Sequence, residues 1–135
     1  MYIMKRYFAL ILLSVLAAST LFAAGNPKVK IAEKSYDFGT IREADGAVSH
    51  DFIIENIGES PLIITSASAS CGCTTPIIPK KPIKAGERAT IRVTYDPAGR
   101  PGEFSKDITV KSNGKPSKFK LKITGTVLPK NKKGK

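Results

Sequence analysis

Hydrophobic and polar residues alternate with a period of two over much of the chain beyond residue 28, and no segment there repeats every 3.6 residues. The alternation is clearest in residues 88–95, 104–110 and 119–127. Because successive side chains of a β-strand point to opposite faces, one face of each strand is expected to be buried. The residues predicted to face a core are Ala89, Ile91, Val93, Tyr95, Phe104, Ile108, Val110, Phe119, Leu121, Ile123 and Val127.

The first half of this region gives a weaker pattern. Residues 29–32 and 36–41 are typical of short edge strands, and residues 48–56 alternate with Val48, His50, Phe52 and Ile54 on one face. The sequence GESP at 58–61 is a turn signal, so a hairpin to a strand at 62–68 is predicted. Residues 74–82 contain three prolines and are therefore expected to form an edge strand or a loop.

About seven short strands separated by glycine- and proline-rich turns indicate an all-β Greek-key sandwich with immunoglobulin-like architecture. Turns are predicted at 85–87 and 96–102, and Asn113 with Gly114 is expected at a hairpin tip. The chain has no Trp and only two Cys, so the disulfide and buried Trp typical of antibody domains are missing. We expect one sandwich domain over residues 25–128.

The N-terminal 24 residues have the pattern of a secretory signal peptide with a helical apolar region. Lys5 and Arg6 precede an uncharged, mostly apolar run at 8–24, which ends in small residues. The alternative is an uncleaved helix that anchors the protein in the inner membrane. Either interpretation predicts a periplasmic or secreted domain in an oxidising compartment, with no nucleic acid as partner.

Positive charge is concentrated in the second half of the chain. The formal net charge is +11, with −3 over residues 24–79 and +12 over residues 80–135. Lys118, Lys120 and Lys122 alternate on the outward face of one predicted strand, and Lys111 is expected to join them across the hairpin. These lysines have two interpretations: a solvated face that protects a sheet edge, or a surface that attracts anionic envelope polymers or lipid head groups. Residues 129–135 are expected to form a disordered basic tail.

The cysteines belong to the candidate binding loop, which comprises Ser70, Cys71, Gly72, Cys73, Thr74, Thr75 and Pro76. In an oxidising compartment a disulfide between the two cysteines is the simplest expectation, with the glycine supplying backbone freedom for both sulfurs to meet. Reduced, packed thiols are a second possibility. Two functional alternatives remain: a soft-metal site for Cu(I) or Zn, and thiol–disulfide exchange.

A metal site on Cys71 and Cys73 would need a third ligand. The only histidine is His50, and the predicted hairpin places it opposite Ala67, some 13 Å from the cysteines at ~3.3 Å per residue. We therefore interpret His50 as a partly buried, hydrogen-bonded residue at a strand end. The chain has no phosphate-binding loop, no zinc-protease motif and no nucleophile–base pair, so neither an enzyme nor a cofactor is predicted.

Several short motifs occur in order along the chain, among them YDFGTI at 36–41, HDFIIEN at 50–56, ASCGCTTP at 69–76 and VTYDP at 93–97. Together they resemble the exported bacterial family of unknown function called DUF1573. A more distant similarity links the chain to the domains of the ASPM/SPD-2/Hydin group and of the major sperm proteins. The resemblance implies a seven-stranded immunoglobulin-like sandwich and no established activity.

The sequence thus favours a non-catalytic binding or structural module of the cell envelope. Its working end is predicted to combine residues 70–76 with the turn at 96–102, because sandwiches bind through end loops or exposed edges. The expected partner is an envelope protein or an anionic envelope polymer. The alternative is a protein that handles a soft metal or exchanges thiols through Cys71 and Cys73.

Overall fold

The computed structural model describes residues 3–4 and 25–131. Eight strands and one short helix follow one another in the described part of the chain: β1 (Val29–Ile31), β2 (Ser35–Arg42), the 3-10 helix η1 (Glu43–Asp45), β3 (Val48–Asn56), β4 (Ile64–Ala69), β5 (Thr74–Ile77), β6 (Arg88–Tyr95), β7 (Gly102–Ser112) and β8 (Lys118–Leu128). The all-β prediction is confirmed, but the count of about seven strands was too low. The additional strand is β5, whose prolines left strand and loop open; it is an edge strand that pairs only with β6.

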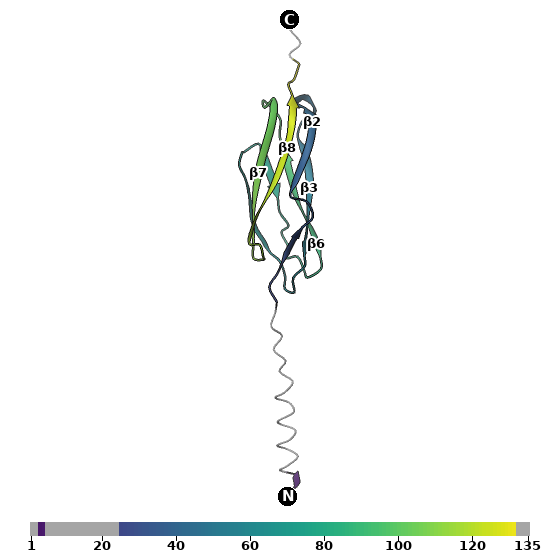
Figure 1. The fold of residues 1–135 in the computed structure, drawn as a ribbon, viewed down its shortest axis with the longest axis vertical. Helices are drawn as coiled ribbons and strands as arrows, with labels where there is room; N and C mark the ends of the chain where they lie inside the picture. Colours follow the sequence, from purple (N-terminus) through teal and green to yellow (C-terminus); the bar gives the residue numbers. More distant parts are fainter. Residues whose placement is uncertain (1–2, 5–24, 132–135) are drawn as a thin grey trace.

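The strands form two four-stranded sheets with the orders β1-β3-β6-β5 and β2-β8-β7-β4. Figure 1 shows the strands running along the long axis of the sandwich, with β2, β8 and β7 side by side. All pairs are antiparallel except β2 with β8, which is parallel. Sequence neighbours therefore often lie in different sheets, as in a Greek-key arrangement.

The core forms where the predicted inward faces meet. Every residue predicted to face inward on β6, β7 and β8 is buried, apart from the half-buried Ala89. Tyr95 of β6 stacks on Phe104 of β7 with ring centroids 4.0 Å apart, which joins the two sheets near one end of the sandwich. On β3, Phe52 and Ile54 are fully buried. Burial of such side chains, at ~1.5–3 kcal/mol each, is the main favourable term in folding.

The predicted hairpin between residues 48–56 and 62–68 is wrong. Strand β3 already has neighbours on both sides, β1 and β6, and β4 lies in the other sheet beside β7. The turn signal at 58–61 is real, but the chain then crosses between the sheets. Leu62 is fully buried during this crossing and exchanges backbone hydrogen bonds of 2.9 and 2.8 Å with Ile83. Period-two alternation predicts strands but not their partners, which is why the local signal was misleading.

The predicted hairpin tip at Asn113 and Gly114 is confirmed: β7 and β8 pair along ten positions on either side of it. The predicted signal helix falls at residues 1–24, of which only 3–4 are described, so it stays a prediction. No helix in the described part of the chain is long and apolar enough to cross a bilayer. Of the predicted tail, residues 129–131 are described and 132–135 lie outside the described residues.

Candidate functional site

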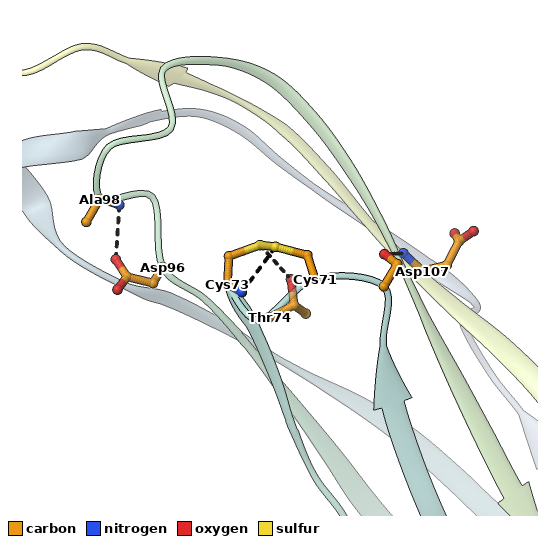
Figure 2. The surroundings of a disulfide bond; sticks show 7 residues. Cys71, Cys73, Thr74, Asp96, Ala98 and Asp107 are labelled. Carbon is orange, nitrogen blue, oxygen red and sulfur yellow. Dashed lines mark hydrogen bonds between the residues drawn. A yellow bond between two sulfur atoms is a disulfide. The ribbon is translucent and has the colours of Figure 1, made fainter.

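The candidate binding loop and the turn at 96–102 meet at one end of the sandwich, which we call the loop end. Here β3 begins opposite Tyr95, and β5 begins opposite the same residue. The backbone N–H of Asp96 donates to the carbonyl of Cys73 over 2.9 Å, which ties the turn directly to the loop. Figure 2 shows Asp96 and Ala98 beside this loop. The strand β1 starts at the opposite end of the sandwich (Figure 1).

The loop is also fixed on its other side, to β7. The N–H of Ser70 donates to the carbonyl of Asp107 over 3.0 Å, and the N–H of Asp107 donates to the hydroxyl of Ser70 over 3.3 Å. Residues 70–76 therefore connect β4 of one sheet to β5 of the other, and backbone hydrogen bonds hold them at both ends. A loop positioned by a rigid scaffold in this way is a common place for binding residues.

Cys71 and Cys73 lie with their sulfur atoms at bonding distance and their Cα atoms 5.2 Å apart, as Figure 2 shows. Cys73 packs into the core, whereas Cys71 is half-buried. The N–H of Cys73 donates to the sulfur of Cys71 over 3.1 Å, and the N–H of Thr74 donates to the carbonyl of Cys71 over 3.2 Å. The pair thus forms the closed tip of the loop, with Cys71 as its more accessible member.

Gly72 does not have the role that the sequence suggested. Its φ lies outside the left-handed region, unlike that of five other glycines, and no atom obstructs a Cβ added at this position. The expected backbone freedom of glycine is therefore not required for the two sulfurs to meet.

Glu43 is a residue of the loop end that the sequence analysis missed. Its carboxylate accepts the backbone N–H of Gly99 over 2.8 Å and that of Lys130 over 3.0 Å. These two hydrogen bonds hold the pKa of the Glu43 carboxyl below its usual range, and the bond from Lys130 has the larger effect. Glu43 thereby ties the turn at 96–102 to the end of β2 and to the segment after β8. No local signal marked it, because its partners lie 56 and 87 residues away.

His50 lies elsewhere and was placed in the wrong register. It is opposite Val93 of β6, not opposite Ala67, and its ring stacks on that of Tyr36 with centroids 3.6 Å apart. Its Nε2 is buried, lies 3.5 Å from a carboxylate oxygen of Glu33 and has no hydrogen-bond partner among the described residues. The prediction of a partly buried histidine on the inward face is confirmed, but the expected hydrogen bond is not found at its Nε2 among the described residues. Within the described residues, no group of three or more His, Cys, Asp or Glu side chains is arranged to hold a metal ion.

The four candidate lysines are exposed on two adjacent strands. Lys111 of β7 pairs with Lys118 of β8, Lys120 is opposite Thr109, and Lys122 is opposite Asp107 with its Nζ 3.9 Å from the carboxylate. Strands β7 and β8 are central in their sheet, so the expected protection of an edge is wrong, whereas the expected solvent exposure of these lysines is observed. They form instead a cluster on the face of the sheet. Among the described residues, Lys122 is the one lysine of this cluster whose charge is partly compensated by a salt bridge, which it forms with Asp107.

Comparisons with solved structures agree with this architecture. A protein of unknown function from Porphyromonas gingivalis W83 is similar with a TM-score of 0.67 and 22% identity, over 81% of this chain and 50% of that one, so this chain spans half of its length. The PapD-like domain 7 of human CEP192 gives a TM-score of 0.64 and 14% identity over 78% of this chain and 89% of that one. The E. coli chaperone DraB gives 0.51 and 13% over 80% and 58%. These likenesses show the fold alone.

A comparison with curated proteins gives no match. The sequence model of the family described as "Protein of unknown function (DUF1573)" matches residues 29–127, which cover both sheets and the Cys71–Cys73 loop apart from the last residue of β8. The chain therefore belongs to the DUF1573 family.

Proposed function

We propose that this protein is a non-catalytic binding module of the cell envelope, periplasmic or secreted, and that it contacts an envelope protein through the loop end. The observation that carries the proposal is the hydrogen-bonded junction of residues 70–76 with the turn at 96–102, made by Asp96 and Cys73. It joins two segments separated by the 19 residues 77–95 into one fixed surface. The N-terminal signal pattern supports export.

The composition of the loop end supports binding rather than catalysis. Its hydrogen bonds are made mostly by backbone groups and by the side chains of Ser70, Asp96 and Glu43, which position the loops. A half-open hollow of about 610 Å³ lies at the end of β8 beside this surface. Its lining residues are Arg42, Ala44, Leu128, Pro129, Lys130 and Asn131. Basic side chains around the half-exposed Leu128 favour a partner that is partly apolar and negatively charged.

The experiment that tests the proposal places a photo-crosslinking residue in the full chain, produced in its own cells. A crosslinker at Ala98 of the turn samples the loop end, and one at Thr90, exposed on the central strand β6, is the matched control. We expect Ala98 to crosslink to one defined envelope protein and Thr90 to give no such product. Equal products from the two positions, or none from Ala98, would contradict the proposal.

We also propose that the Cys71–Cys73 pair is oxidised in the exported protein and serves to fix the loop. The rival function is thiol–disulfide exchange, which the half-buried position of Cys71 at the loop tip favours. Titration of free thiols in protein recovered from the envelope, without added reductant, separates the two. We expect the wild-type protein to contain no free thiol. A Cys71→Ser/Cys73→Ser variant of normal fold should still crosslink from Ala98, because backbone hydrogen bonds also hold the loop at both ends. A mixed disulfide with another protein at Cys71 would support the rival.

Loss of the disulfide is expected to cost little stability. A ring closed over three residues removes little entropy from the unfolded chain, about 1.5 kcal/mol in the chain-entropy model. Urea unfolding of the double serine variant should therefore show a decrease of the free energy of unfolding no larger than this. A variant that fails to fold would show that the pair is essential to the sandwich and not only to its loop.

A further inference from the structure

A two-sheet sandwich has four edge strands, here β1, β2, β4 and β5. An edge presents unpaired N–H and C=O groups to which another strand can pair, and proteins usually protect such edges. Two of the four edges are protected by backbone structure. The N–H of Val29 in β1 already donates to Lys115 over 2.9 Å. Strand β2 is interrupted between Asp37 and Thr40, where the Asp37 carboxylate accepts the N–H of Gly39 over 2.8 Å.

The edge of β5 lacks free donors. The carbonyl of Cys73 accepts a hydrogen bond from Asp96, so Cys73 faces β6 and, by alternation along the strand, Thr74 and Pro76 face the free side. Proline has no N–H, and the N–H of Thr74 is already bonded to Cys71 over 3.2 Å. A strand added to β5 would find no donor at either position.

The edge of β4 has a register shift between Ile64 and Ser66, but from Ser66 to Ala69 its pairing with β7 is regular and none of the other protections is present. Ser70, which follows β4, faces β7 through its bond to Asp107, so the N–H and C=O groups of Ala67 and Ala69 face the free side. The strand Ile64–Ala69 contains no charged residue, no proline and no residue larger than isoleucine. Thr65, Ser66 and Ser68 are exposed, and their small side chains leave the backbone accessible. Strand β4 also leads directly into the candidate binding loop, which Figure 2 shows between β4 and β5.

Charge indicates which strand could pair there. On the outward face of the same sheet, Lys111 of β7 lies beside β4 and is followed by Lys118 of β8. Two copies of this chain joined through β4 would form one continuous sheet with both lysine clusters on it, and each copy carries a formal charge of +11. Such an arrangement is disfavoured by like-charge repulsion, whereas acidic side chains on an added strand would be attracted.

We infer that β4 accepts an extended, acidic segment of another protein as an additional strand of the sheet β2-β8-β7-β4, next to the loop end. This inference deepens the proposed function and rests on it. Main-chain hydrogen bonds to Ala67 and Ala69 supply the affinity, and the lysines of the neighbouring strands select the charge of the segment. The small side chains of β4 leave space for larger residues of the partner strand.

The test places a photo-crosslinking residue at Ser66 of the full chain in its own cells, parallel to the one at Ala98, with the crosslinked peptides mapped by mass spectrometry. We expect both positions to capture the same protein, and Ser66 to map to a segment with net negative charge. A Ser68→Asp variant, which repels an acidic strand, should reduce the Ser66 product at least tenfold. The matched Thr90→Asp variant, on the exposed face of β6, should leave it unchanged.

The outcomes distinguish the inference from the proposed function. Capture from Ala98 without capture from Ser66 would overturn the β4 inference and leave the loop-end proposal intact, whereas no capture from either would overturn both. A Ser66 product of twice the chain mass would identify a second copy as the occupant and contradict the acidic partner. A basic or neutral mapped segment, or equal loss in Ser68→Asp and Thr90→Asp variants that both unfold at the wild-type urea midpoint, would also overturn the inference.

Discussion

Asn56 shows how one buried polar side chain determines the course of the backbone. It is fully buried, and its Nδ2 donates to the carbonyls of Ser60 and Ile83 over 2.8 and 2.9 Å. Its Oδ1 accepts the N–H groups of Gly58 and, at 3.5 Å, Lys28. One side chain thus fixes the turn after β3, the entry to β1 and the loop before β6. With these hydrogen bonds the chain crosses between the sheets after β3 and does not form the hairpin that the turn signal predicted.

Replacement of Asn56 by Ala should destabilise the protein strongly. The substitution leaves backbone carbonyls and N–H groups buried without partners, at about 1–3 kcal/mol for each unsatisfied group. We expect the free energy of unfolding to fall by about 2–4 kcal/mol, measured by urea unfolding followed by circular dichroism. Asn131→Ala, on an exposed residue, is the control and should leave the midpoint unchanged. A loss below about 1 kcal/mol at Asn56 would contradict the importance of this network.

Glycines at two positions should respond differently to alanine. Gly72 has open space around it and no unusual φ, so Gly72→Ala should keep the loop, the stability and the oxidised pair. At Gly125 a Cβ would lie 2.7 Å from the ring of Phe104 and 3.0 Å from the carbonyl of Gly39, so Gly125→Ala should destabilise the sandwich by about 1–3 kcal/mol. Thermal unfolding and thiol titration measure both effects. Equal destabilisation by the two substitutions would contradict this account of the loop.

At the scale of the element, the outward face of the sheet β1-β3-β6-β5 carries paired charges where the other sheet carries a lysine cluster. Arg92 of β6 is directly opposite Asp51 of β3 and donates two hydrogen bonds of 2.7 and 3.0 Å to its carboxylate. These hydrogen bonds are the main reason why the pKa of Asp51 lies below its usual range. Both side chains are exposed, so the pair contributes to register and pH response more than to stability.

The sign of the pH effect follows from this lowered pKa. A carboxyl with a lower pKa in the folded than in the unfolded chain stabilises the fold at neutral pH, and this contribution is lost in acid as the pH falls through the lowered pKa. We expect an NMR titration of the Asp51 carboxyl to show a midpoint below the usual value, and Arg92→Gln to raise it. Arg88→Gln, on the neighbouring Arg of the same strand, is the control. An unchanged Asp51 midpoint in Arg92→Gln would show that the pair does not persist in solution.

At the scale of the whole molecule, the fold places the two candidate binding surfaces, the loop end and the lysine cluster, apart from one another. The loop end joins the cysteine pair, the turn at 96–102 and Glu43, whereas the lysine cluster lies on the flank of one sheet. Binding of a protein at the loop end alone would leave the lysine cluster free for an anionic polymer, whereas an acidic strand added to β4 would compete with the polymer for Lys111 and Lys118. Strand β1 starts at the end of the sandwich opposite to the loop end (Figure 1), so the proposed binding surface lies away from the start of β1.

The lysine cluster can be tested separately from total charge. We expect Lys118→Gln/Lys120→Gln to elute from a heparin column at clearly lower salt than the wild type, because clustered charges release more counterions on a polyanion than scattered ones. Lys30→Gln/Lys81→Gln removes the same charge from exposed positions elsewhere and is the matched control. Equal shifts in elution for the two variants would show that only the net charge matters.

The sequence by itself determined the strands, their buried faces, the hairpin tip at Asn113 and the charge of the chain. These properties follow from local alternation, from turn chemistry and from counting, and they need no knowledge of distant residues. The family resemblance and the motif around Cys71 and Cys73 were also legible at this level, as was the meeting of that motif with the turn at 96–102.

Only the tertiary structure decided which strands are neighbours. In the structure β4 lies in the other sheet, His50 is opposite Val93, and the lysines of β8 are on a central strand. Strand β4 is at the edge of its sheet, with no strand on its outer side. Glu43 and Asn56 gained their roles in the same way, from partners far along the chain. The physical reason is that a strand's own pattern specifies which face it buries, while its lateral partners are chosen by packing of the two sheets and by buried hydrogen bonds between distant segments.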